Sequence, residues 1–485
     1  MPSSSHGWNF DHSYAGLPDV FFREQAPSPV TQPEVVVFNE ALAEELGIGS
    51  LSSDLQAQAV LLGGNQLPPG AQPIAQAYAG HQFGHFTMLG DGRAILLGEQ
   101  ITPAGQRFDI QLKGAGRTPF SRRGDGRATL SSMLREYLMS EAMYHLGIPT
   151  SRSLAVVATG EQVYRQPIQT GAVLSRVASS HLRVGTFEFA KRFGDESAVR
   201  ILIDYALARH YPERVGSERP ALALLEVVME KQVALIVNWL RVGFIHGVMN
   251  TDNMGIAGET FDYGPCAFMN AYDPKTVFSS IDTQGRYAYG HQARIAHWNL
   301  AVLAGALLPV VDPDEELALE LVRASIDRFA DLFTESWFRM MFDKLGLVIA
   351  QPSDRKLVEE LLLLMRTHQA DFTHTFLALR REQQPEEAIT EDPDFQQWFE
   401  RWTQRLKEQT DRTAALDLMT RSNPVRIARN HLVEAALEAA VAGNMQPFHQ
   451  LVRDLQQPYR DTGEEPAFQS APAGFDEGYK TYCGT

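Results

Sequence analysis

The sequence predicts an α+β protein with two lobes, the first rich in strands and the second helical. Between about residues 80 and 177, short apolar runs alternate with turns that contain Gly and Asp, which is typical of strands. A long amphipathic segment begins at Pro220, and apolar residues at helical spacing dominate the chain that follows. With 485 residues, of which 44% are hydrophobic and 21% charged, the chain can bury a substantial core.

Residues 1–75 are rich in Pro, Ser and Gly, and we expect them to form an N-terminal arm that packs on the core. One helix is predicted in the arm, Asn39–Leu46, because Gly47 follows it as a stop signal. The β-rich lobe is predicted over residues 76–185. Its expected elements are the strands Phe86–Leu89, Ala94–Leu97, Phe108–Leu112, Leu154–Ala158 and Ala172–Val177, and the helix Ser132–Leu146.

The helical lobe is predicted over residues 186–314. Its longest helix is Pro220–Leu240, where Pro stands at the first helical position and Gly243 closes the segment. An irregular polar segment, His246–Asp273, follows this helix. Residues 315–485 are predicted to form a helical extension and a C-terminal tail.

The charge of the chain limits its partners. There are 43 Lys and Arg against 59 Asp and Glu, a formal net charge of −16. This excess argues against general binding to nucleic acid or to an anionic membrane, because both are polyanions. An anionic ligand therefore needs a local basic site.

Cysteine content and hydropathy bear on the cellular compartment. Two cysteines are too few for a disulfide scaffold or a Cys-based zinc site. The first basic residue is Arg23, which leaves no basic segment of a signal or transit peptide. The most apolar stretch, Ile295–Val311, falls short of the ~20 apolar residues that span a bilayer. We expect a soluble, cytoplasmic protein, and a monomer by default.

The segment Leu89–Arg93 places two glycines between predicted strands. Gly90 and Gly92 allow main-chain N–H groups to approach a phosphate closely, and Arg93 adds positive charge. The alternative is a plain Asp-Gly hairpin turn.

Lys113 ends a predicted strand, and Glu136 lies on the helix that follows. A strand Lys held by a helix Glu is how kinase-type sites hold a nucleotide phosphate. Glu141, on the same helix, is a competing partner for the lysine.

Basic residues concentrate in one part of this acidic chain. Lys113–Arg127 holds five Lys or Arg against the single acid Asp125, and Arg176 and Arg183 follow. This density indicates polyphosphate binding. The alternative is an exposed basic loop that pairs with the acidic remainder.

The segment Phe244–Asn253 (FIHGVMNTDN) follows the long helix, and Asp262-Tyr-Gly264 comes shortly after it. A His-x6-Asn loop followed by Asp-Tyr-Gly is similar to the metal-binding arrangement of protein kinases, in which Asn253 and Asp262 would be oxygen ligands to Mg²⁺. The glycine turn, strand Lys, helix Glu and this loop occur in kinase order. They predict a protein-kinase-like, two-lobed fold.

One group of a kinase is missing. A protein kinase has its catalytic Asp two residues after the His, and this position is Val248 here, which cannot accept a proton. Asp252 is the nearest carboxylate. Either the chain is an inactive kinase, or Asp252 serves a differently placed reacting group.

Long motifs throughout the chain resemble one known family. They are Ala79–Gly84 (AGHQFG), Leu89–Ala94 (LGDGRA), Gln111–Pro119 (QLKGAGRTP), Ser121–Arg127 (SRRGDGR), Arg135–Ala142 (REYLMSEA) and His246–Asn253 (HGVMNTDN). These motifs are similar to those of the selenoprotein O family, and the resemblance extends from about Phe10 to Gly484.

The resemblance implies a protein-kinase-like fold and protein adenylyltransferase activity. ATP would bind in a flipped orientation, and AMP would be moved onto Ser, Thr or Tyr hydroxyls of proteins. The resemblance implies that Asp252 accepts the proton and that Glu136 orients Lys113. Asn253 and Asp262 would be ligands of Mg²⁺, with Mn²⁺ as an alternative. The implied nucleotide contacts are Gly90, Gly92, Arg93, Lys113, Asp125, Gly126, Arg176, Arg183 and Asp262.

Many eukaryotic members of this family carry selenocysteine near the C-terminus, where this chain has Cys483. Cys266 lies two residues after Gly264, in the position of a kinase activation segment. We hypothesise that Cys266 and Cys483 form a reversible disulfide that makes activity redox-dependent. The alternative is two unlinked thiols.

Three functions stay open from the sequence. The first is AMP transfer to proteins. The second is phosphoryl transfer with Asp252 as a displaced base. The third is a catalytically inactive, nucleotide-binding scaffold, which Val248 motivates.

Overall fold

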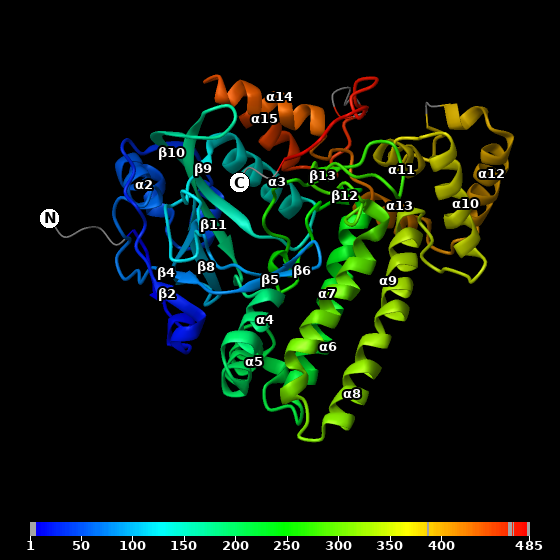
Figure 1. Ribbon diagram of the computed structural model, residues 1–485. Coiled ribbons are helices and arrows are strands. Elements are labelled where there is room, and N and C mark those ends of the chain that lie inside the picture. The colour runs from blue at the N-terminus through cyan, green and yellow to red at the C-terminus, as the bar shows by residue number, and fades with distance from the viewer. Residues whose placement is uncertain (1–5, 386–387, 464–467, 469, 483–485) are drawn as a thin grey trace.

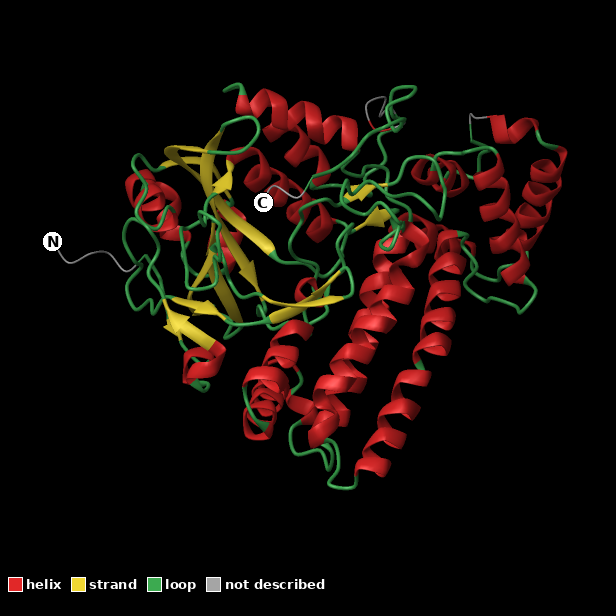
Figure 2. Cartoon of the chain, viewed as in Figure 1, coloured by secondary structure: helices red, strands yellow, loops and turns green. Residues whose placement is uncertain are grey.

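The computed structural model describes residues 6–385, 388–463, 468 and 470–482. A strand-rich lobe lies beside a helical lobe, and a further helical block follows (Figures 1 and 2). This confirms the predicted α+β, two-lobed architecture. The specific likeness to a protein kinase stays a prediction.

The first lobe is built on a sheet of nine strands in the described part of the chain, with the main order β2-β4-β7-β8-β11-β10-β3. The pairs along it are antiparallel, β1 adds to β7, and β9 adds to β11. The strands are β1 (Phe10–Asp11), β2 (Phe22–Glu24), β3 (Glu34–Phe38), β4 (Ile74–Gln76), β7 (Ala94–Ile101), β8 (Arg107–Lys113), β9 (Ala128–Thr129), β10 (Arg152–Val163) and β11 (Gln169–Ala178).

The register of β8 against β11 separates a polar face from an apolar one. Gln111 stands opposite Arg176, and Lys113 follows two residues later, so these three side chains share one face of the sheet. Ile110 and Leu112 point to the other face and join a separate apolar cluster. One sheet therefore supplies both a core and a charged site.

The N-terminal arm contributes more structure than the sequence predicted. The expected helix is α1 (Glu40–Glu45), and the Asn39 side chain caps it by accepting a hydrogen bond from Leu42 N at 3.1 Å. The strands of the arm were missed, because they are only two to five residues long and pair with strands far along the chain. Together with α2 (Leu55–Leu62), the arm covers the apolar face of the sheet.

The expected strands and helices of the first lobe are present, and their ends lie within a few residues of the predicted ones. The helix is α3 (Leu130–His145), which begins at the N-cap Thr129. Two short sheets lie outside the main one: β5 (Ala79–Gln82) with β6 (His85–Met88), and β12 (Phe244–Ile245) with β13 (Ala267–Phe268). The β5–β6 hairpin extends from the main sheet toward the helical lobe (Figures 1 and 2).

The helical lobe centres on the long helix predicted from Pro220. Its helices are α4 (Val184–Phe193), α5 (Glu196–His210), α6 (Pro220–Arg241), α7 (Gln292–Leu307), α8 (Glu315–Asp327) and α9 (Phe329–Lys344). The sequence placed the stretch Ile295–Val311 below the length of a membrane span, but among the described residues Tyr289–Val310 is long and apolar enough to cross a membrane by length and composition alone. Half of it is buried inside the protein and α7 packs on α4 and α6, as in the core helix of a globular protein.

The C-terminal block consists of α10 (Asp354–Thr367), α11 (Phe372–Arg380), α12 (Pro393–Lys407), α13 (Arg412–Ser422), α14 (Asn430–Val441) and α15 (Gln446–Leu455). Its last two helices pack on α3, far back in the sequence (Figure 1). Arg135 of α3 forms a 2.9 Å ion pair with Glu434 of α14, and the rings of Tyr137 and Phe448 lie 6.2 Å apart. The block therefore buttresses the helix that carries Glu136.

Replacing Phe448 by Ala is expected to lower the free energy of unfolding by about 3–5 kcal/mol, because the side chain is fully buried beneath α3 and a cavity would remain. Denaturant titration measures the change. Gln450→Ala, at an exposed position of the same helix, is the control and should change stability by less than about 0.5 kcal/mol. An equal effect of the two substitutions would contradict the buttressing role.

Candidate active site

Asp262 lies at the centre of three cations between the lobes. Its Oδ1 is 2.6 Å from Lys113 Nζ and 2.7 Å from Arg176 Nη1, and its Oδ2 is 3.6 Å from Arg183 Nη1. Burial alone would raise the pKa of Asp262, but Arg176, Lys113 and Arg183 together hold this pKa well below its usual range. The carboxylate therefore stays ionised and neutralises the cations.

Lys113 and Glu136 are brought together as a buried ion pair, with 2.6 Å between Nζ and Oε2. Glu136 Oε1 is also 3.4 Å from Arg176 Nη1. The competing acid Glu141 pairs instead with Arg152 at 2.8 Å. The lysine is thus held between one carboxylate from α3 and Asp262.

Two polar residues that were not predicted as site residues, Gln111 and Asp91, lie beside Arg176 and Arg183. Gln111 Oε1 accepts a hydrogen bond from Arg176 Nη2 at 2.5 Å, and its Nε2 donates to Asp91 Oδ2 at 3.1 Å. The other oxygen of Asp91 is 3.9 Å from Arg183 Nη2. Burial raises the pKa of Asp91 to about 6, against the influence of Arg183. In the sequence, the position of Asp91 between the two glycines of the turn was the feature that could have identified it as a site residue.

Arg183 is fixed from both sides. Its guanidinium lies 4.1 Å from the ring centroid of Tyr78 and 4.9 Å from that of Phe261. Its Nη1 also donates to the main-chain oxygen of Asp252 at 2.9 Å. This contact ties the cation cluster to the loop that carries Asp252.

The glycine turn connects β6 to β7 and packs against the basic loop. Gly90 has φ 110°, and a Cβ atom there would overlap the ring of Phe120. Thr118 Oγ1 donates to the main-chain oxygen of Asp91 at 2.6 Å, and the Ser121 hydroxyl donates to that of Gly92. The next residue of the turn, Arg93, accepts a hydrogen bond from Gly114 N at 2.7 Å through its main-chain oxygen.

The basic loop is fastened by ion pairs to residues at the end of β10 and just after it. Asp125 Oδ2 is 2.8 Å from Arg165 Nη1, and the hydrogen bond from this guanidinium lowers the pKa of Asp125. Gly126 has φ 73°, and a Cβ atom there would overlap the main chain of Gly116. Arg127 pairs with Glu161 at 3.1 Å, so part of the loop's charge does pair with acidic residues elsewhere.

Asp252 is nearly buried, with 7% of its surface exposed, and its Oδ1 has no hydrogen-bond partner among the described residues. The pKa of Asp252 is raised to about 7, chiefly by burial; Arg183 opposes this rise, and Asp262 and Glu188 contribute to it. Gly80 of β5 lies so close that a Cβ atom there would overlap the carboxylate. An acid of this kind can accept a proton near neutral pH.

Asn253 and Asp262 fit a magnesium site in their donor chemistry. Asn253 Nδ2 donates to Val248 O at 2.9 Å, which fixes the amide and leaves its Oδ1 as an oxygen donor. The described residues contain no group of three or more His, Cys, Asp or Glu that could hold a metal. Two protein oxygens are nevertheless usual for Mg²⁺, which takes its other ligands from phosphates and water.

Cys266 is buried, and burial raises the pKa of its thiol to about 12. The segment 264–280 runs beside the C-terminal tail, because Thr481 Oγ1 donates to Pro265 O at 2.7 Å. Cys483 lies outside the described residues, so the Cys266–Cys483 disulfide stays a prediction.

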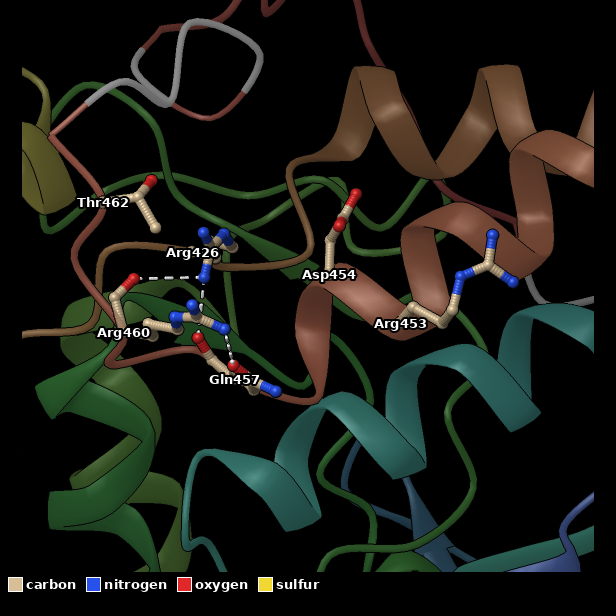
Figure 3. A pocket seen from close by; sticks show the side chains of 6 residues that line it. All are labelled: Arg426, Arg453, Asp454, Gln457, Arg460 and Thr462. Carbon is tan, nitrogen blue, oxygen red and sulfur yellow. Dashed lines mark hydrogen bonds between the residues drawn. The ribbon is translucent and has the colours of Figure 1, made fainter.

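A separate hollow lies in the C-terminal block (Figure 3). It is lined by Arg426, Arg453, Asp454, Gln457, Arg460 and Thr462. Arg426 Nη1 donates to the main-chain oxygens of Gln457 and Arg460, at 2.9 and 3.1 Å. No residue of the Asp262 cluster contributes to this hollow.

A cation cluster beside a buried carboxylate, at the junction of a strand lobe and a helical lobe, is an arrangement that nucleotide-dependent transferases use. The family model described as Protein adenylyltransferase SelO matches residues 6–456. The chain belongs to the SelO family.

Curated relatives carry a matching description. A Protein nucleotidyltransferase YdiU of Halalkalibacterium halodurans is 53% identical over 482 residues, which cover 99% of this chain and 98% of the relative. A protein of the same name from Nitrosococcus oceani is 52% identical over 493 residues and covers 100% of both chains. Another, from Brevibacillus brevis, is 52% identical over 486 residues, covering 100% of this chain and 99% of the relative. The chain is therefore a nucleotidyltransferase.

Proposed function

We propose that the protein transfers AMP from ATP to Ser, Thr or Tyr hydroxyls of other proteins and releases diphosphate. The observation that carries this proposal is the gathering of Lys113, Arg176 and Arg183 around one carboxylate, while an apolar residue, Val248, stands at the kinase base position. Such a cluster suits the part of the nucleotide on which negative charge develops.

In the proposed reaction the acceptor oxygen attacks the α-phosphorus. The bond from this phosphorus to the bridging oxygen of the β-phosphate breaks, and diphosphate leaves with the electron pair. Asp252 takes the proton of the acceptor hydroxyl, for which a pKa of about 7 suits it.

Lys113, Arg176 and Arg183 are proposed to hold the β- and γ-phosphates. Glu136 and Gln111 keep the first two side chains in place, so little reorganisation is needed as charge builds on the leaving group. This arrangement requires the triphosphate to bind with its terminal phosphates innermost, the reverse of a kinase. The glycine turn with Arg93, and Asp125 and Gly126, would contact the rest of the nucleotide.

Asn253 and Asp262 would hold Mg²⁺, with Mn²⁺ as an alternative. The ion, when bound, supplies neutralisation of phosphate charge. Asp262 forms ion pairs with Lys113 and Arg176 at 2.6 and 2.7 Å. A triphosphate therefore competes with Asp262 for these cations.

The test is incubation with a mixture of acceptor proteins, Mg²⁺ and ATP labelled at the α- or the γ-phosphorus. Retention of the α label on protein is expected. Retention of the γ label would indicate phosphoryl transfer, and no retained label with intact ATP binding would indicate an inactive scaffold. Either result would overturn the proposal.

Gly80→Ala is expected to lower kcat for transfer by roughly 10²-fold, because the added methyl group overlaps the Asp252 carboxylate and displaces it. Initial rates at saturating ATP measure the change, and ATP affinity should stay the same. Gly305→Ala is the matched control, because a Cβ atom at this helical glycine meets nothing within 4 Å. Equal activity of the two variants would contradict the close approach of β5 to the base.

A further inference from the structure

The β5–β6 hairpin is fastened to the loop that carries Asp252. His81 N donates to Thr251 Oγ1 at 2.7 Å, and Phe83 N donates to Asn250 Oδ1 at 3.0 Å. The inner strand, β5, therefore lies against the catalytic loop. The outer strand, β6, lies on the other side of β5.

The main chain of β6 has a free edge. Phe83 and Gly84 form a two-residue turn with φ 51° and 89°, and Gln82 stands opposite His85 as its closing pair. In a hairpin with such a turn the closing pair is of the hydrogen-bonded type. Hydrogen-bonded pairs alternate along an antiparallel ladder, and Leu89 N indeed donates to Tyr78 O at 3.0 Å further along it.

The N–H and C=O groups of the intervening residues, Phe86 and Met88, therefore point away from β5. No hydrogen bond joins these groups to any residue that the structure describes outside the hairpin. The side chains of Phe86 and Met88 are 44% and 55% exposed. Proteins usually protect such an apolar edge with charges, Pro or a covering segment, and an unprotected edge is a template for another strand.

Next to this edge, the rings of Phe86, His81 and Trp298 form an aromatic row, and Arg286 lies at its end. The ring of His81 lies 5.6 Å from that of Phe86 and 5.3 Å from that of Trp298 in α7. The guanidinium of Arg286 lies 4.9 Å from the Trp298 ring centroid, near the turn of the hairpin. The Nε atom of Arg286 is buried and has no hydrogen-bond partner among the described residues. Its charge is complementary to an acidic side chain on an occupant.

We propose that an extended segment of the acceptor protein adds as a strand to the outer edge of β6, with apolar side chains on Phe86 and Met88 and an acidic side chain near Arg286. This inference rests on the proposed function. Two strand spacings of ~4.8 Å separate such a segment from β5, which carries Gly80 beside Asp252. The paired stretch itself is therefore too far from Asp252 to react, and the acceptor hydroxyl belongs to a residue beyond that stretch.

The direct test is the binding of a labelled peptide to the full-length protein, by fluorescence anisotropy and without nucleotide. The probe alternates Val and Thr around one Ser, with Glu at one end. A second peptide is identical except for N-methyl groups on alternate amides, and a third has Lys in place of Glu. Because binding is measured without transfer, this experiment can fail independently of the proposed function.

Three changes should each weaken binding of the first peptide by at least roughly tenfold, the effect of losing one or more main-chain hydrogen bonds or an apolar contact. They are N-methylation of the peptide, Met88→Pro, and Phe86→Ser in the protein. Met88→Pro removes a donor that faces away from β5 and leaves the ladder within the hairpin intact. Leu363→Ser, at a 64% exposed apolar residue of α10, is the control and should leave binding unchanged.

Reversing the charge of Arg286 tests its proposed contact with an acidic side chain of the bound segment. Arg286→Glu should weaken the Glu peptide and strengthen the Lys peptide. ATP affinity should stay unchanged in every variant. N-methylated and unmodified peptides that bind the wild-type protein equally would overturn the proposal, and this comparison needs no variant to fold. Wild-type protein that modifies proteins but binds none of the peptides would overturn it as well.

Discussion

Replacing Asp252 by Asn is expected to lower kcat for AMP transfer by roughly 10²–10⁴-fold, the usual contribution of a general base. The amide has the size of the carboxylate but cannot accept the acceptor proton. ATP affinity should stay close to that of the wild-type protein, because the contact between Asp252 and Arg183 uses the main-chain oxygen. Single-turnover transfer of α-labelled AMP and equilibrium binding measure the two quantities separately. Transfer by Asp252→Asn above about a tenth of the wild-type rate would contradict the role of the base.

The pH dependence of the wild-type enzyme follows from the same residue. Burial raises the pKa of Asp252 to about 7, and only the deprotonated carboxylate accepts a proton. The kcat/KM of the free enzyme should therefore rise with pH through about 7 and level off above it. In Asp252→Asn this rise should be absent. A rise with the same midpoint in both proteins would assign the titration to another group.

Asp262→Ala is expected to lower transfer by at least about 10³-fold, because it removes a proposed metal ligand worth several kcal/mol of charge stabilisation. It also leaves Lys113, Arg176 and Arg183 with one carboxylate fewer. Rates at saturating Mg²⁺ and thermal denaturation measure the two effects.

Asp343→Ala is a control for the loss of an acid elsewhere in the helical lobe. Its carboxylate pairs with Arg339 at 3.2 Å, and no residue of the Asp262 cluster contacts it. Full transfer by Asp262→Ala at high Mg²⁺ would show that the metal assignment is wrong.

The sequence predicted those parts of the site whose residues carry a local signal. Lys113 ends an apolar strand and Glu136 lies on the next helix, and this pair is 2.6 Å apart in the structure. Asp262 was identified from its tripeptide. The structure adds that Lys113, Arg176 and Arg183 all converge on it.

The residues that contact Arg176 and Arg183 could not be predicted in the same way. Gln111 meets Arg176 because β8 pairs with β11. Asp91 and Tyr78 meet Arg183 because the segment after β6 returns to the end of β4, where Asp91 N donates to Gln76 O at 2.9 Å and Leu89 N donates to Tyr78 O at 3.0 Å. Long-range pairing of this kind leaves no periodicity in a single segment. Gln111 is the partial exception, because its spacing of two from Lys113 places both side chains on one face of a strand.

The short strands of the N-terminal arm were missed for a related reason. β2 and β4 are three residues long, and β4 is held by its pairing with β7 rather than by its own propensity. The long helix α6 was predicted closely, because twenty-two residues give a helical pattern many repeats.

The most direct test of the account is a crystal structure of Asp252→Asn with an ATP analogue that is not cleaved between the α- and β-phosphates, in the presence of Mg²⁺. The proposed orientation predicts the β- and γ-phosphates on Lys113, Arg176 and Arg183, with the α-phosphorus facing residue 252. A γ-phosphate that faces residue 252, with the α-phosphate on the cations, would contradict AMP transfer.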